Sequence, residues 1–361
     1  MKFLRLAFYV LIAQLVLSGC AGEAVEETSS SSSSEINFDA YLGRNASTRS
    51  EVTDNTHLKG TEGNSGFGVF ARYNYNGKIL SLLDTEHVTW NKDQNHWEYT
   101  NTRYWPSEGS VDFYAFAPYS DQPKLVSPPN KNEANPTCIF FPSNVSPVDL
   151  VWANAKDQTK TEEPVKFTFN HALARLGLDI KANQDLEENG AVIKVKEVKL
   201  YGADEISGVF VMAGYLNLEN GAWTLADNGI RWFYTWTPDG KVDGNENVNE
   251  KDGTVLKLSA SQLDHEHDII TNDADSYIFI IPQVKYFPFY LQITYKVKQG
   301  DFEEEVTVRK NLLDVRNPPG DPNPSFSFEM GKAYVFHLKL SLDPINFNVT
   351  NDVEPWKGGE R

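Results

Sequence analysis

The chain has 361 residues, of which 40% are hydrophobic and 12% aromatic, so it has material for a sizeable core, and its length predicts two domains. Its formal net charge is −17 at pH 7, which repels nucleic acid and anionic lipid headgroups and excludes them as partners. Lys194, Lys196 and Lys199 fall in a strand-like stretch and are interpreted as a solvated face, not as a basic patch.

Residues 1–19 have the organisation of a signal peptide. Lys2 and Arg5 form a short basic region, and residues 6–17 form an apolar run too short to span a bilayer as a helix. Two small residues then precede Cys20, which is the order of a lipobox. We expect cleavage before Cys20 and acylation of its thiol and amine, which leaves a mature lipoprotein held to the membrane only by its lipid. An ordinary secretory signal is the alternative.

Residues 20–35 form a polar segment that includes six consecutive serines at 29–34. Such a segment buries too little apolar surface to offset its ordering entropy, so we expect a flexible tether. The acidic residues at 23, 26 and 27 are interpreted either as an export signal for the cell surface or as an aid to solubility. Once Cys20 is acylated, Cys138 has no partner within the chain, so no disulfide holds the fold.

Alternation of apolar and polar residues dominates the rest of the chain and predicts an all-β protein. Residues 291–297 and 334–342 are the clearest examples, and turn signals occur at 220–221, 238–240 and 318–320. The apolar parity changes within residues 171–178, which we interpret as a strand with a bulge. A polar stretch at 155–164 predicts the boundary between two β-sandwich domains, residues 36–160 and 161–361.

Two segments at opposite ends of the chain share a pattern of alternating apolar residues. Ile36, Phe38 and Ala40 precede the first domain, and Ile345, Phe347 and Val349 close the second. Both triplets suit the same kind of slot in a sheet, although two edge strands also share such a pattern by chance. After the first triplet, residues 47–50 form a polar stretch in which Arg49 and Ser50 would suit a trypsin-like protease.

The order and spacing of several motifs identify a family. The chain resembles the Mfa-like branch of the Bacteroidales fimbrillins, which are the subunits of type V pili, and the likeness extends from the lipobox to the C-terminus. The residues that carry it are Ile36-Asn37-Phe38, Thr48-Arg49-Ser50, Gly66-Phe67-Gly68-Val69-Phe70, Tyr104-Trp105-Pro106, residues 111–118, residues 169–176, Ile280-Ile281-Pro282-Gln283, Gly331-Lys332-Ala333-Tyr334 and Val353-Glu354-Pro355-Trp356.

This resemblance implies two transthyretin-like β-sandwich domains in tandem and export as a lipoprotein to the outer membrane and cell surface. It also implies that an arginine-specific protease removes the N-terminal segment before assembly into the fimbria. On this sequence that cut maps between Arg49 and Ser50, with Arg44 as a second choice. The implied partners are other fimbrial subunits in a head-to-tail polymer and, for adhesion, a host or bacterial surface receptor or glycan.

The cut has a physical rationale in donor-strand exchange. While residues 36–40 stay attached, their effective concentration at their own slot is about millimolar, and a strand from another molecule cannot compete. Cutting after Arg49 lets them dissociate and opens an edge that accepts another strand. Residues 345–353 are the candidate donor strand, or else a fixed strand of the second domain. A fixed strand indicates a tip subunit, and an uncut tether indicates an anchor subunit.

Enzyme and metal motifs fit poorly, and we expect neither a catalytic site nor a cofactor. The chain has no His-Glu-x-x-His, no nucleophile elbow and no phosphate-binding glycine loop. His265 and His267 share one face of a strand, a pattern that a polar strand produces without a metal. Residues 239–250 nearly fit a calcium loop, but Lys241 stands where a ligand oxygen is required.

Aromatic residues suggest a rival function. Trp90, Trp97 and Trp105 cluster in sequence, and exposed aromatics of this kind form platforms for sugar rings, so a surface-exposed glycan-binding lipoprotein is the alternative to a fimbrial subunit. Packing of the same side chains in a sandwich core is the competing interpretation. We expect His171 to pack with its ring hydrogen-bonded and Cys138 to fill apolar space.

Overall fold

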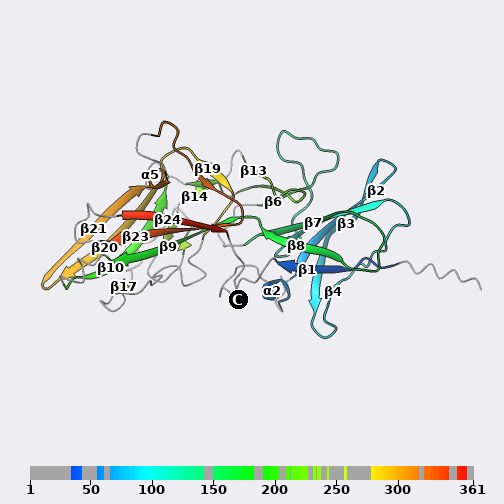
Figure 1. The fold of residues 1–361 in the computed structure, drawn as a ribbon, viewed down its shortest axis with the longest axis horizontal. Helices are drawn as coiled ribbons and strands as arrows, with labels where there is room; N and C mark the ends of the chain where they lie inside the picture. Colours follow the sequence, from blue (N-terminus) through cyan, green and yellow to red (C-terminus); the bar gives the residue numbers. More distant parts are fainter. Residues whose placement is uncertain are drawn as a thin grey trace, which may run out of the picture. The chain divides into compact units, whose positions relative to one another are not determined.

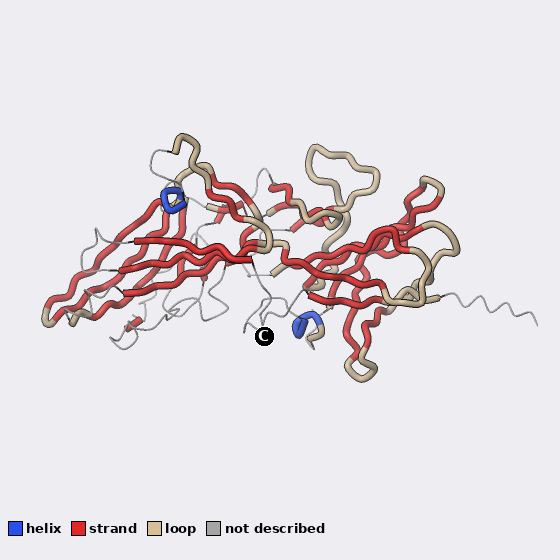
Figure 2. The backbone as a smooth tube through the Cα atoms, viewed as in Figure 1, coloured by secondary structure: helices blue, strands red, loops and turns tan. Residues whose placement is uncertain are grey.

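The protein is described by a computed structural model, and the residues that it describes form strands and loops apart from two short helices (Figure 2). The structure describes residues 34–42, 55–60, 66–141, 149–182, 190–202, 209–211, 213–226, 231–232, 234–236, 242–243, 256–257, 278–316, 321–340 and 348–355. Residues 1–34 and residues 35–361 form separate units, and nearly all described residues belong to the second. Among the described residues, no helix has the length and apolarity needed to cross a membrane.

A seven-stranded sheet contains most of the first half of the described chain. Its strand order is β1-β8-β7-β5-β2-β3-β4, with β1 beside β8 at one edge (Figure 1). The strands are β1 (Phe38–Leu42), β2 (Phe67–Tyr75), β3 (Lys78–Asn91), β4 (His96–Tyr99), β5 (Ser110–Ala117), β7 (Val151–Gln158) and β8 (Val165–His171). All neighbours are antiparallel except β1 and β8, which run parallel.

Two larger sheets form the C-terminal half. A six-stranded sheet has the order β16-β15-β10-β20-β21, with β17 also paired to β10, and a four-stranded sheet has the order β18-β9-β23-β24. The first contains β10 (Val192–Tyr201), β15 (Tyr234–Trp236), β16 (Val242–Asp243), β17 (Leu256–Lys257), β20 (Tyr290–Gln299) and β21 (Phe302–Asn311). The second contains β9 (Ala174–Ala182), β18 (Ile278–Ile280), β23 (Lys332–Leu340) and β24 (Asn348–Pro355).

Shorter elements complete the fold. A three-stranded sheet joins β6 (Cys138–Phe141), β12 (Gly214–Asn217) and β13 (Trp223–Leu225). Two-stranded sheets pair β11 (Phe210–Val211) with β14 (Arg231–Trp232), and β19 (Gln283–Lys285) with β22 (Phe326–Phe328). The helices in the described part of the chain are α2 (Asn55–Leu58) and α5 (Leu313–Arg316).

Buried apolar side chains of the described residues form three clusters. The first lines the seven-stranded sheet and includes Phe67 and Phe113, and the second lies among the C-terminal sheets and includes Leu291 and Phe336. A third cluster combines residues from both halves of the chain and includes Trp152. Because burial of each large apolar side chain is worth about 1.5–3 kcal/mol, these clusters supply the stability that a chain without a disulfide framework requires.

Most of the strands predicted from alternation are present. The alternation at 291–297 lies in β20, and that at 334–342 lies in β23 as far as Leu340, after which residues 341–342 fall outside the described residues; the alternating apolar side chains of both strands are buried. The turn predicted at 220–221 joins β12 to β13, and Gly221 has a φ of +75°. A Cβ there would lie 2.3 Å from the Trp152 ring, so glycine suits both the backbone and the packing. The turns predicted at 238–240 and 318–320 lie outside the described residues.

The interpretation of residues 171–178 as one bulged strand is wrong. Strand β8 ends at His171 and β9 begins at Ala174, and the two strands belong to different sheets. The apolar parity changes because Phe169 packs in the first cluster whereas Leu176 packs in the second. The polar stretch at 155–164 includes the turn between β7 and β8, and the chain passes from one sheet to another at Ala172 and Leu173.

Candidate functional site

Strand β1 is the candidate site, because it comes before the predicted cut and lies at the edge of a sheet. Phe38 to Leu42 pair in parallel with Val165 to Phe169 of β8. Just before the first of these pairs, the Val165 amide donates a hydrogen bond of 2.8 Å to the Asn37 carbonyl. The main-chain groups of this segment therefore belong to the sheet.

Every second side chain of the segment is buried. The exposed fractions are 0% for Ile36, 4% for Phe38, 7% for Ala40 and 3% for Leu42. Tyr41, between them, is 45% exposed. This alternation is the period of a strand with one face in a core, and all four buried side chains belong to the first cluster.

An aromatic pocket surrounds Phe38. Its ring centroid lies 5.3 Å from that of Tyr99, 5.7 Å from those of Phe113 and Phe167, and 6.5 Å from that of Phe67. Most of these pairs meet edge to face or tilted, which is the arrangement that aromatic rings prefer. Phe38 is thus the side chain that fixes β1 most firmly to the sheet.

Main-chain contacts hold the start of the segment on the side away from β8. The Ile36 amide donates to the Arg103 carbonyl at 2.8 Å, and the Tyr99 hydroxyl donates to the Ile36 carbonyl at 2.8 Å. Glu35 forms an antiparallel bridge with Tyr104. Burial raises the pKa of Tyr99, which keeps its hydroxyl protonated and able to donate at neutral pH.

A side-chain amide holds the end of the segment. Asn55 Oδ1 accepts from the Leu42 amide at 2.8 Å, and Asn55 Nδ2 donates to the Leu42 carbonyl at 3.3 Å. Asn55 begins α2, so this contact joins β1 to the chain that follows the predicted cut. Strand β1 therefore occupies a slot with β8 along one side and separate polar contacts at its two ends.

The other predicted site residues are only partly described. Cys20, the predicted lipidation site, lies outside the described residues, as do Arg44, Arg49 and Ser50. Of the candidate C-terminal donor strand, Ile345 and Phe347 also lie outside them. Val349 is buried in β24, an edge strand that pairs antiparallel with β23. His265, His267 and nearly all of the candidate calcium loop fall outside the described parts of the chain.

Two of the three tryptophans of the proposed sugar platform are buried, and Trp90 is half-buried. Trp97 is 4% exposed and Trp105 is 6% exposed, and both belong to the first cluster, as the core interpretation predicts. Trp90 packs on Trp97 at 5.2 Å between ring centroids, and Lys59 Nζ lies 3.8 Å from the Trp90 ring centroid. These positions do not support a platform for sugar rings.

Two further predictions from the sequence are confirmed. Cys138 is buried, and this burial raises the pKa of its thiol to about 11. His171 is buried at the end of β8, where its Nδ1 lies 3.0 Å from Asp149 Oδ1. Both residues are thus packed in the protein interior, as the sequence predicts.

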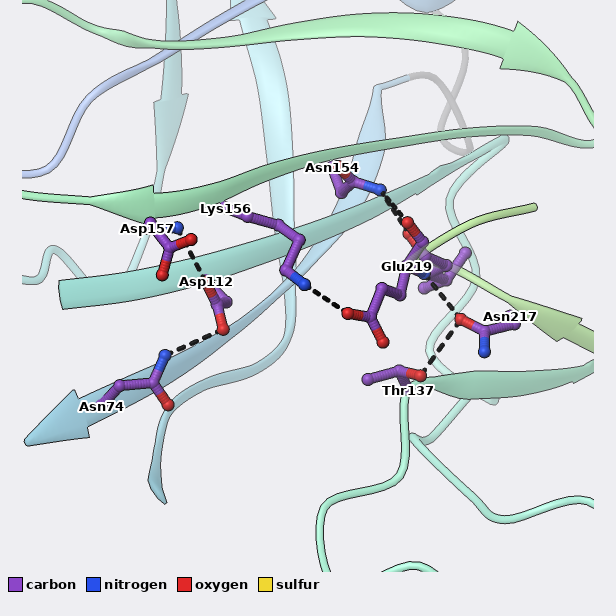
Figure 3. Close-up of polar contacts among 9 residues, drawn as sticks. Asn74, Asp112, Thr137, Asn154, Lys156, Asp157, Asn217 and Glu219 are labelled. Carbon is purple, nitrogen blue, oxygen red and sulfur yellow. Dashed lines mark hydrogen bonds and ion pairs between the residues drawn. The ribbon is translucent and has the colours of Figure 1, made fainter. Parts of the chain in front are cut away.

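Figure 3 shows the polar contacts between β7 and the turn that follows β12. Asn154 Nδ2 donates to the carbonyls of Leu218 at 2.9 Å and Glu219 at 2.8 Å, and Lys156 forms an ion pair with Glu219. Asn217 Oδ1 accepts from Thr137 Oγ1 at 3.1 Å. The contacts of Asn154 and Lys156 attach the three-stranded sheet to the seven-stranded sheet, and the contact of Thr137 with Asn217 lies within the three-stranded sheet region.

Sequence reasoning missed the polar contacts at both ends of the slot. Tyr99, Asn55 and Arg103 belong to none of the motifs that the sequence analysis singles out. Arg103 makes its contact through its backbone carbonyl, which any residue could supply. Asn55 is separated from Leu42 in the sequence by residues without strand periodicity. Neither can be found without the fold.

Comparisons with known proteins point to one family. A family model described as fimbrillin-like matches residues 48–356. A fimbrial protein from Bacteroides vulgatus has 20% identity and a TM-score of 0.60, with coverage of 90% of this chain and 99% of that protein. A protein assigned to cell adhesion from Bacteroides uniformis has 17% identity and a TM-score of 0.50, with coverage of 90% and 100%. No curated protein matches the chain.

Proposed function

Because this chain belongs to the fimbrillin-like family, a family of structural adhesion proteins and not of enzymes, we propose that it is a fimbrial subunit assembled by donor-strand exchange. In this proposal the signal peptide, residues 1–19, is removed and Cys20 is acylated. Residues 20–35 tether the protein to the outer membrane at the cell surface until an arginine-specific protease cuts after Arg49, or after Arg44 as the second choice.

The position of β1 is the observation that carries this proposal. A five-residue strand at the edge of a sheet precedes the proposed cut, and its paired backbone and buried side chains make it a structural part of the uncut protein. Ile36, Phe38 and Leu42 each contribute roughly 1.5–3 kcal/mol if fully buried. Loss of this strand would expose apolar surface and unpaired β8 groups, a state that binds another strand.

The cut changes the competition for the slot. Before it, β1 is tethered at an effective concentration of about millimolar and excludes other strands. After it, β1 can diffuse away, and a strand from a second subunit enters beside β8 as β-augmentation. Because the donor strand and the slot are different surfaces, such contacts are head-to-tail and extend into a filament.

Ile345, Phe347 and Val349 are the proposed donor residues, since their spacing matches that of Ile36, Phe38 and Ala40. Strand β24 pairs with β23 through eight residue pairs, so donation of Val349 requires β24 to leave its own sheet. A subunit that keeps β24 in place would accept a strand without donating one, as a tip subunit does. We also propose that the two halves are transthyretin-like sandwich domains, with the change between them at Ala172 and Leu173.

Digestion with an arginine-specific protease tests the proposal. We expect a stable fragment that begins at Ser50 and forms ladders in detergent gels unless it is boiled. The Arg49→Ala variant should resist the cut and remain monomeric while keeping the unfolding temperature of the parent. A fragment that begins at Ser50 but stays monomeric would contradict assembly by exchange, and a cut that persists in the variant would move the site to Arg44.

A further inference from the structure

The contact between Asn55 and Leu42 crosses the proposed cut. Leu42 lies before Arg49 and Asn55 lies after it, so cleavage leaves the two hydrogen bonds without a covalent link between their partners. We propose that Asn55 is a strand-binding residue of the mature subunit. It holds the C-terminal end of whichever strand occupies the slot, first β1 and then a strand from a second copy. This inference rests on the proposed strand exchange.

Both hydrogen bonds go to main-chain atoms. The Asn55 carboxamide supplies one acceptor for the Leu42 amide and one donor for the Leu42 carbonyl, as a neighbouring strand would. Such a contact depends on the position of the bound backbone and not on the side chain that it carries. Asn55 can therefore bind a strand of another sequence as well as it binds β1.

Residues that remain after the cut hold Asn55 in place. Leu58, in the same short helix, is 2% exposed, and its carbonyl accepts from the Gly66 amide at 2.9 Å. Lys59 Nζ lies 3.8 Å from the ring centroid of Trp90. Neither of these two contacts involves β1, so α2 keeps its attachment to the seven-stranded sheet when β1 leaves.

The two ends of the slot together select one register. Arg103 and Tyr99 bind the backbone of Ile36, and Asn55 binds the backbone of Leu42, six residues further on. A strand shifted by one residue would turn its apolar side chains to solvent. A shift of two residues keeps their direction but moves the aromatic side chain out of the Phe38 pocket, so the polar ends and this pocket together fix the register.

Hydrogen exchange in the uncut protein tests the contact without requiring assembly. We expect the amide of Leu42 to exchange roughly tenfold faster in Asn55→Ala than in the parent, because its acceptor is removed. Asn55→Asp keeps the acceptor and should preserve most of the protection. Asn220→Ala removes another side-chain acceptor, which binds the Ala222 amide on an exposed turn, and should leave Leu42 unchanged. Equal exchange in Asn55→Ala and the parent would overturn the proposal.

Strand capture tests the role after the cut. The protein is digested with the arginine-specific protease and incubated with a fluorescent synthetic peptide of residues 34–42, with a peptide of the reversed sequence as control. We expect the digested parent to bind the first peptide and Asn55→Ala to bind it roughly tenfold more weakly. If the parent binds and Asn55→Ala binds equally well, the role of Asn55 is overturned while strand exchange stands. If the parent binds neither peptide, strand exchange itself fails.

Discussion

Phe38 has more aromatic neighbours than any other side chain of β1, so its truncation should weaken the attachment of β1 to the sheet. We expect Phe38→Ala to lower the free energy of unfolding of the uncut protein by about 3–5 kcal/mol, because four rings lose their contact and a cavity remains. Urea denaturation followed by tryptophan fluorescence measures this change.

Tyr41 provides the matched control on the same strand. It is 45% exposed and points away from the core, so Tyr41→Ala should change the free energy of unfolding by no more than about 0.5 kcal/mol. Equal effects of the two substitutions would mean that β1 does not depend on the Phe38 pocket.

Cys138 should be unreactive in the folded protein. Burial raises the pKa of its thiol to about 11, so only about one molecule in a thousand carries a thiolate at pH 8. In a Cys20→Ser background, where Cys138 is the only thiol, we expect reaction with a disulfide reagent to be at least about a hundredfold slower in buffer than in urea. Comparable rates would show that the thiol is accessible.

The same shift makes stability depend on pH in a defined direction. The unfolded thiol loses its proton near pH 8.5 and the folded thiol near pH 11, so between these values the unfolded state binds fewer protons. The free energy of unfolding should therefore fall as pH rises through this window. The fall should be smaller in Cys138→Ala, and identical pH profiles for the two proteins would contradict a raised thiol pKa.

At the scale of elements, two kinds of polar contact attach β7 to the turn after β12, and their contributions to stability should differ. Asn154→Ala removes the donor for two backbone carbonyls, so we expect a loss of about 1–3 kcal/mol. Lys156→Ala removes an ion pair whose side chains are 39% and 40% exposed, so we expect a loss below about 1 kcal/mol. Thermal denaturation of the two variants checks this order, and the reverse order would assign the attachment to the ion pair.

The strands themselves could largely be predicted from sequence, because a two-residue period is a local signal. Residues 334–340 and 291–297 alternate strictly and lie in β23 and β20. Sheet membership is not local, since it depends on which core each apolar face contacts. For this reason the pattern around residues 171–178 suggests one bulged strand, whereas the fold divides Phe169 and Leu176 between two clusters.

The slot could be predicted only in part. The alternation of Ile36, Phe38 and Ala40 indicated a buried strand, and the structure buries all three. The pairing of β1 with β8, more than 120 positions later, has no local signal. The hydrogen bonds of Tyr99 and Asn55 need the completed fold as well, because each joins side-chain atoms to a backbone that another element positions.

At the scale of the whole molecule, the route from β1 to β24 has a mechanical consequence. Strand β1 lies beside β8, and β8 passes through only Ala172 and Leu173 into β9, which pairs with β23, the neighbour of β24. In a filament assembled as proposed, tension on a captured strand would pass along this series of strands to the strand that the subunit donates. A strand pulled along its own length loads its hydrogen bonds in shear, so they resist together instead of opening one at a time.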